Sequence, residues 1–155
     1  MKKLLITLFS ASVVFGAKPT PPKFLSIDPV KTMWVSAGKS FETTVTVKVE
    51  PPFHIQANPV SQPNLIPTTI EFAEKEGVSL EAVTYPEGKV FRLENSDKDL
   101  MVYGGEVKFK VKFSTAKAKP GKVDMAGTFR FQPCNDKICF FPTRLPLNVT
   151  VQVMK

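Results

Sequence analysis

The sequence is poor in the residues that most metal sites and hydrolytic active sites require. Its 155 residues contain only two cysteines and one histidine. A four-ligand structural zinc site would need carboxylates in addition to these three side chains. A Ser/His/Asp hydrolase would have to use the single histidine, His54, as its base. We therefore expect any chemistry at Cys134 and Cys139, which lie close together in one short segment.

The sequence also lacks an apolar run of about 20 residues, the length that a transmembrane helix needs. A shorter apolar stretch follows Lys2 and Lys3 and ends at the small residues Gly16 and Ala17. A basic start, a short apolar stretch and a small-residue exit are typical of a cleaved secretory signal peptide. We expect a signal peptide at 1–17, a linker at 18–24 and one domain at 25–155, outside the cytoplasm, where disulfides persist.

Sustained helical periodicity is absent, and period-two alternation of apolar and polar residues takes its place, which indicates half-buried strands. The alternation is clearest over the ranges 41–50, 106–113, 123–132 and 144–153. Shorter strands are expected over the ranges 32–36, 54–57, 68–72 and 78–85. Seven to nine short strands separated by turns predict an all-β antiparallel β-sandwich. Trp34 and Phe41 are expected in its core. The basic strand face at 108–112 is expected to be solvated, and no nucleic-acid partner is predicted.

The two cysteines are separated by four residues, with turn-forming Asn135 and Asp136 between them. A hairpin with this loop would place the cysteines opposite each other, within disulfide distance. Proline cannot donate a ladder hydrogen bond, so Pro133 and Pro142 place the hairpin at a sheet edge, with reachable sulfurs. Strand parity from 123–131 places Cys134 off the core face unless Pro133 shifts the register.

Three interpretations of the pair compete. A structural disulfide is the simplest, although so short a loop contributes less stability than a long-range bridge. The thiols could instead hold a soft metal such as Cu(I) together with His54 or Met101. Thiol–disulfide exchange needs one accessible thiolate and a second thiol nearby, and a close pair in an exposed turn provides both. The redox interpretation is favoured over the other two.

Three segments together resemble the N-terminal periplasmic domain family of the thiol:disulfide interchange protein DsbD. The first is aromatic-Gln-Pro-Cys at 131–134, followed after four residues by Cys-Phe-Phe-Pro at 139–142. The second is Pro-Phe-His-Ile-Gln-Ala-Asn-Pro at 52–59, which resembles an early strand beside the cysteines. The third is Val-Tyr-Gly-Gly-Glu at 102–106, which resembles a loop that caps the thiols. The resemblance covers nearly the whole chain after the signal peptide.

The resemblance implies an immunoglobulin-like sandwich in the periplasm that carries electrons. By it, Cys139 matches the attacking cysteine and Cys134 the resolving one. A cap would cover the sulfurs, chiefly with Val102 and Tyr103, and is formed by Leu100, Met101, Val102, Tyr103 and Gly104. Supporting positions in the matching motifs are His54, Gln56, Gln132, Phe140 and Pro142. His54 is expected either to fill a structural role or to stabilise the Cys139 thiolate.

The resemblance also implies partners and no resident cofactor or metal. Reducing equivalents would come from a thioredoxin-like protein or domain fed by a membrane electron transporter, and would pass to disulfide-bonded periplasmic acceptors. The chain would be a component of protein-disulfide reductase type, and a monomer. The printed chain ends at Lys155, so a stand-alone version with separate partners is expected. The alternative is a non-enzymatic binding or chaperone-like sandwich with an inert disulfide.

Overall fold

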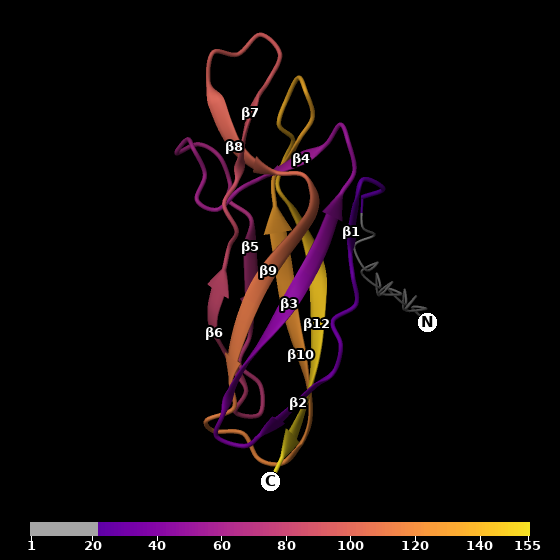
Figure 1. Ribbon diagram of the computed structural model, residues 1–155, viewed down its shortest axis with the longest axis vertical. Helices are drawn as coiled ribbons and strands as arrows, with labels where there is room; N and C mark the ends of the chain where they lie inside the picture. Colours follow the sequence, from indigo (N-terminus) through magenta and orange to yellow (C-terminus); the bar gives the residue numbers. More distant parts are fainter. Residues whose placement is uncertain (1–21) are drawn as a thin grey trace, which may run out of the picture.

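The computed structural model describes residues 22–155, and these form twelve β-strands and no helix (Figure 1). The expected signal peptide at 1–17 and the first part of the expected linker lie outside the described residues. The strands are β1 (Leu25–Ile27), β2 (Met33–Ser36), β3 (Ser40–Val49), β4 (His54–Gln56), β5 (Thr69–Phe72), β6 (Ser79–Thr84), β7 (Lys89–Arg92), β8 (Asp99–Tyr103), β9 (Gly105–Ser114), β10 (Gly121–Phe131), β11 (Pro133–Cys134) and β12 (Thr143–Met154).

Two four-stranded sheets form the body of the sandwich. One has the order β1-β3-β9-β6 and the other the order β2-β12-β10-β5. Figure 1 shows β3 and β9 in front of β10 and β12, with all four running along the long axis of the molecule. All pairings within these sheets are antiparallel except that of β2 with β12, which is parallel. The predicted all-β sandwich is confirmed. The expectation of antiparallel pairing fails at β2, which pairs with β12 in parallel.

The core follows directly from the period-two pattern, because alternate residues of a strand point to opposite faces of the sheet. In β9 the buried residues Val107, Phe109, Val111 and Phe113 alternate with exposed Glu106, Lys108, Lys110 and Lys112. The long β10–β12 ladder pairs eleven residues of each strand, from Gly121 with Val153 to Phe131 with Thr143. The apolar side chains on its inward face are buried and complete the single core.

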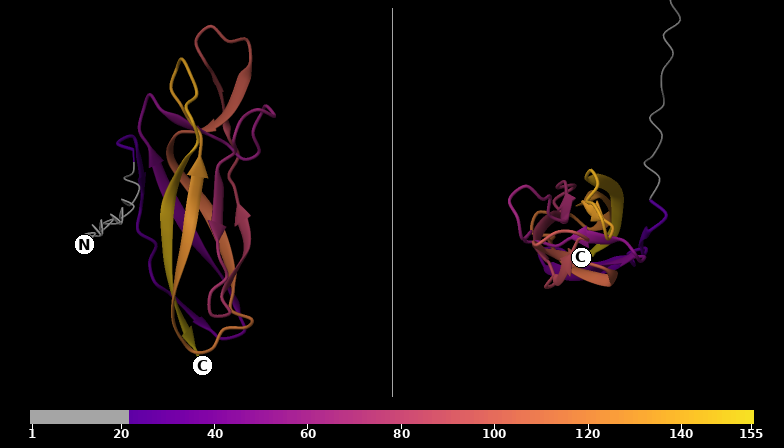
Figure 2. Two further views of the ribbon diagram at one scale, coloured as in Figure 1. Left: turned by 180° about the vertical axis from the view of Figure 1, so that it is seen from behind. Right: turned by 90° about the horizontal axis from the view of Figure 1, so that it is seen from above.

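A third, smaller sheet lies at one end of the sandwich, in the order β11-β4-β8-β7. Seen from behind, the β7–β8 hairpin and the turn after β11 project side by side at this end, opposite the C-terminus (Figure 2). Both cysteines belong to this end, because Cys134 is the last residue of β11. The third sheet therefore holds the cysteine segment at one end of the sandwich.

Trp34 is the one clear error in the expected core. It is 68% exposed, whereas its neighbour Val35 is buried, because successive residues of β2 face opposite sides and Val35 takes the inward position. Phe41 packs against the core as expected. The short strands β1 and β7 were not anticipated, since three or four residues carry too little alternation to stand out. No helix in the part of the chain that the structure describes is long and apolar enough to cross a membrane.

Candidate functional site

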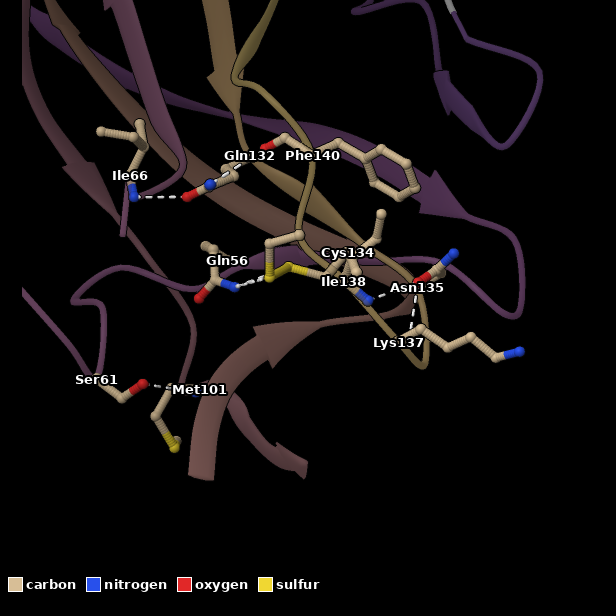
Figure 3. Close-up of a disulfide and its surroundings, with 11 residues drawn as sticks. Gln56, Ser61, Ile66, Met101, Gln132, Cys134, Asn135, Lys137, Ile138 and Phe140 are labelled. Atoms are coloured by element: carbon tan, nitrogen blue, oxygen red, sulfur yellow. Dashed lines mark hydrogen bonds between the residues drawn. A yellow bond between two sulfur atoms is a disulfide. The ribbon is translucent and has the colours of Figure 1, made fainter. Parts of the chain in front are cut away.

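The cysteine hairpin, residues 133–140, is shaped by its own turn. The side-chain carbonyl of Asn135 accepts hydrogen bonds from the backbone N–H groups of Lys137 and Ile138, both at 2.9 Å. The Asn135 N–H donates to the Ile138 carbonyl at 3.0 Å. This Asn-centred turn folds the chain back on itself. Cys134 and Cys139 thus lie opposite each other, 3.9 Å apart at Cα, and form a disulfide (Figure 3).

Gln132 fastens the base of the cysteine hairpin. Its side-chain nitrogen donates to the Phe140 carbonyl at 3.1 Å, and its side-chain oxygen accepts the Ile66 N–H at 2.8 Å. The Phe140 N–H donates to the Pro133 carbonyl at 2.8 Å. Figure 3 shows Gln132 between Ile66 and Phe140 and directed away from the disulfide. Gln132 therefore holds the backbone around the cysteines and does not touch the sulfurs.

The two cysteines differ in exposure. Cys134 is 0% exposed, whereas Cys139 is partly exposed. The expectation that Cys134 lies off the buried face is wrong, because the chain leaves the β10 ladder after Phe131 and Cys134 pairs with His54 of β4 in a different sheet. Of the two cysteines, only Cys139 therefore reaches the protein surface.

Large apolar side chains surround the accessible cysteine. Ile138 is 54% exposed and Phe141 is 92% exposed, and Phe140 between them is also exposed. The Phe140 ring lies 6.1 Å from that of Phe53, measured between ring centroids. Exposed apolar side chains gathered around a functional group are typical of protein-interaction surfaces.

Gln56 is the side chain that contacts both sulfurs. It is completely buried in β4, and its side-chain nitrogen donates to Cys134 Sγ at 3.0 Å and to Cys139 Sγ at 3.5 Å (Figure 3). Its position was expected to be a supporting one on sequence grounds. The structure brings Gln56 into direct contact with the disulfide, 78 residues away from Cys134 in the chain.

His54 lies opposite Cys134 in the β4–β11 pairing. Its ring stacks on Phe91 of β7, with centroids 4.2 Å apart, and lies close above Gly104, where a Cβ atom would come within 2.9 Å of His54 Cδ2. Burial lowers the pKa of His54 below its ordinary value of 6.5, against the opposing effects of the Asp136 carboxylate and of a backbone hydrogen bond at Pro52. The neutral imidazole is therefore favoured at neutral pH.

The expected cap segment, Leu100–Gly104, lies in and just after β8. Val102 is buried and pairs with Gln56 across the β4–β8 ladder, and Leu100 on the same face of β8 is also buried. The Met101 N–H donates to Ser61 Oγ at 3.3 Å. Paired residues of a ladder project to the same face, so Val102 and Leu100 lie on the face of the third sheet that carries Gln56.

Tyr103 has a different position from the one expected. Its hydroxyl accepts the Asn58 N–H at 3.1 Å and donates to the Pro86 carbonyl at 2.8 Å. Its ring packs edge-on against Phe109, 5.5 Å away between centroids, in the main core. Adjacent residues of a strand face opposite sides, so Tyr103 points into the sandwich while Val102 faces the cysteine side.

The loop between β7 and β8 meets the cysteine hairpin through a contact that the sequence did not reveal. The Glu94 N–H donates to the Asp136 carbonyl at 2.7 Å. Within the β7–β8 hairpin, Arg92 and Asp99 form an ion pair. The β7–β8 hairpin is thus joined to the cysteine turn by a single backbone hydrogen bond. Within residues 22–155, no cluster of three or more His, Cys, Asp or Glu side chains could hold a metal ion.

The chain matches a known protein family over most of its length. The family model described as thiol:disulfide interchange protein DsbD, N-terminal, matches residues 22–150. The chain belongs to the DsbD N-terminal family. This family relays reducing equivalents through a cysteine pair, and thioredoxin-like domains are its partners. The predicted family and the sandwich are confirmed, and the disulfide lies at the pair that the resemblance indicated.

Two solved structures share the fold of this chain. The N-terminal periplasmic domain of ScsB from Proteus mirabilis superposes with a TM-score of 0.52 at 13% identity, over 80% of this chain and 43% of that one. The reduced DsbD N-terminal domain of Neisseria meningitidis gives a TM-score of 0.51 at 15% identity, over 86% of this chain and 90% of that one. The chain thus spans less than half of the ScsB structure. No curated protein sequence matches it significantly.

Proposed function

We propose that this domain carries out thiol–disulfide exchange in the periplasm through the Cys134–Cys139 pair. It would take reducing equivalents from a thioredoxin-like protein or domain supplied by a membrane electron transporter, and deliver them to disulfide-bonded periplasmic acceptors. The observation that carries the proposal is the unequal exposure of the two disulfide-bonded cysteines, with Cys139 partly exposed and Cys134 fully buried. Exchange requires one accessible sulfur and a second one within bonding distance of it.

The electron balance follows from this asymmetry. A thiolate of the reduced donor attacks Cys139 Sγ, and the bond between Cys139 and Cys134 breaks, so Cys134 leaves as a thiolate. The second thiolate of the donor then attacks the donor sulfur of the mixed disulfide and releases Cys139. The donor dithiol becomes a disulfide, and this domain gains two electrons and, from solvent, two protons. The same steps in reverse direction reduce an acceptor disulfide, with Cys139 attacking and Cys134 resolving.

The surroundings of Cys139 support docking of a protein partner. Ile138, Phe140 and Phe141 expose apolar surface on the chain segment that carries the sulfur. The buried Val102 and Leu100 lie on the same sheet face as Gln56, which supports a role for the β8 part of the cap segment in shielding the cysteine pair. The hydrogen bond between Glu94 and Asp136 holds the β7–β8 hairpin against the cysteine turn. In this proposal the hairpin moves aside when a partner docks.

Trapping of the mixed disulfide tests the proposal. A Cys134→Ala variant retains Cys139 and has lost the resolving sulfur. Its Cys139 thiolate should attack a thioredoxin whose resolving cysteine is replaced by serine and whose remaining cysteine is activated as the mixed disulfide with thionitrobenzoate, so that thionitrobenzoate leaves and a stable adduct accumulates. The matched Cys139→Ala variant retains only the buried sulfur and should form at least tenfold less adduct, measured on non-reducing gels. The proposal is refuted if Cys134→Ala forms no adduct while the wild-type disulfide also resists reduction by thioredoxin and excess dithiothreitol.

A further inference from the structure

Gln56 occupies an unusual position for a polar side chain. It is 0% exposed, is the last residue of β4, and lies between buried Ile55 and buried Ala57. A buried amide is costly unless its hydrogen bonds are satisfied. Among the described residues, its side-chain oxygen has no hydrogen-bond partner, and the only acceptors of its side-chain nitrogen are the two sulfurs. The donor nitrogen of this amide is therefore directed at the disulfide, and its oxygen makes no hydrogen bond to any described residue.

The backbone of Gln56 is held firmly on both sides. Its N–H donates to the Gln132 carbonyl at 3.0 Å, and its carbonyl accepts the hydroxyl of buried Thr68 at 2.6 Å. These two bonds fix the point from which the side chain extends. The donor is thus positioned before any reaction begins, which is the condition under which a hydrogen bond best stabilises a developing charge.

The sulfur nearer to the Gln56 amide is the one on which charge would appear. When a partner attacks Cys139, the electron pair of the broken bond goes to Cys134 Sγ. That sulfur is fully buried, and a buried anion without a hydrogen-bond donor is strongly disfavoured. The distances of 3.0 Å to Cys134 and 3.5 Å to Cys139 show that the amide favours the leaving sulfur.

We propose that the Gln56 side-chain amide stabilises the thiolate of Cys134, as leaving group when the disulfide is opened and as nucleophile when the mixed disulfide is resolved. The inference rests on the proposed function and assigns a catalytic contact within it. No other side chain among residues 22–155 hydrogen-bonds to either sulfur. The His54 ring packs on Phe91, and Lys137 is exposed on the outer side of the turn.

Single-cysteine variants allow the contact to be measured directly. In a Cys139→Ala background only Cys134 titrates, and its thiolate absorbs at 240 nm, with the Cys134→Ala/Cys139→Ala protein as the blank. Adding Gln56→Met removes the donor at similar length, so the pKa of Cys134 should rise by about one to two, the equivalent of a charge-assisted hydrogen bond. Gln56→Glu places a carboxylate beside the sulfur and should raise this pKa at least as far. In the Cys134→Ala background the same change should move the Cys139 pKa less.

Gln132→Met is the matched control. Gln132 lies in the same region and bonds to Ile66 and Phe140, but it does not touch a sulfur, so its loss should leave the Cys134 pKa unchanged. With both cysteines present, Gln56→Met should slow reduction by dithiothreitol about tenfold, because a poorer leaving thiolate departs more slowly. Melting curves identify any variant that is unfolded. If Gln56→Met is unfolded, the effect of Gln56→Glu on the Cys134 pKa tests the inference instead.

The outcomes separate this inference from the proposed function. If wild type exchanges with dithiothreitol and thioredoxin but neither Gln56 variant changes the Cys134 pKa, the role of Gln56 is refuted and the proposed function stands. If wild type does not exchange at all, the proposed function fails whatever the pKa values are. A pKa rise of equal size in Gln132→Met would also overturn the inference, because it would show a general effect of loosening the hairpin.

Discussion

Reduction of the Cys134–Cys139 disulfide should leave the sandwich folded. A domain that carries electrons has to be stable both as a disulfide and as a dithiol. The bridge joins residues only five apart in sequence. In the chain-entropy treatment, a loop this short stabilises the folded state by about 2 kcal/mol, well below the contribution of a bridge that joins distant strands.

The structure explains why the remaining contacts suffice. The β10–β12 ladder runs as far as Phe131 and Thr143 and ends before the cysteine hairpin begins. Gln132 and the bond between Phe140 and Pro133 close the base of the hairpin without help from the sulfurs. For a domain of this size, a loss of about 2 kcal/mol lowers Tm by about 5–10 °C.

The assay is thermal unfolding by circular dichroism with and without a phosphine reductant. The Cys134→Ala/Cys139→Ala protein is the control, and its Tm should not respond to the reductant. A fall in Tm of more than about 20 °C, or loss of the β-sheet spectrum at 25 °C on reduction, would refute the reasoning. Such a result would show that the pair is a structural bridge on which the fold depends.

Two further predictions concern the core and the histidine. Phe109→Ala should destabilise the protein by about 3–5 kcal/mol in urea unfolding, because the completely buried ring packs against Tyr85, Tyr103 and Phe129. Phe141→Ala, at a 92% exposed position, should change the free energy of unfolding by less than about 0.5 kcal/mol. Equal losses in the two variants would contradict the assignment of the core. Burial lowers the pKa of folded His54 below 6.5, so the unfolded chain binds that proton more readily than the folded protein does. The stabilising contribution of neutral His54 is therefore complete above about pH 6.5. It declines as the pH falls from there through the folded pKa. His54→Gln should lack this decline, and parallel urea-midpoint profiles for wild type and variant between pH 5 and 8 would disprove it.

Most of the sandwich could be predicted because its strands are exposed on one face. Such strands alternate strictly, and the pattern in 106–113 or 144–153 marks both the strand and its buried side. The opposition of Cys134 and Cys139 could also be predicted, since Asn135 specifies a local turn. These features depend on residues near one another in sequence, where propensity and periodicity are informative.

The errors near the cysteine pair arise where the chain passes from one sheet to another. Counting parity onward from β10 places Cys134 outside, but the count has no meaning once β11 joins β4 in the third sheet. The same limit applies to Tyr103, whose inward orientation depends on its partners Asn58 and Pro86, and to Phe91, which stacks on His54. The contact of Glu94 with Asp136 joins two irregular loops through the backbone alone, and no side-chain pattern encodes it.

The placement of the two cysteines between the longest paired strands has a kinetic consequence. β10 leads into the hairpin and β12 leads out of it, and their ladder continues up to the hairpin on both sides. In the proposed exchange, this framework keeps Cys134 at a very high effective concentration while Cys139 is bound to a partner, so resolution should be intramolecular and fast. Covalent complexes of the wild-type protein should therefore be short-lived, and each encounter should end in complete two-electron transfer before the partner can be exchanged for another.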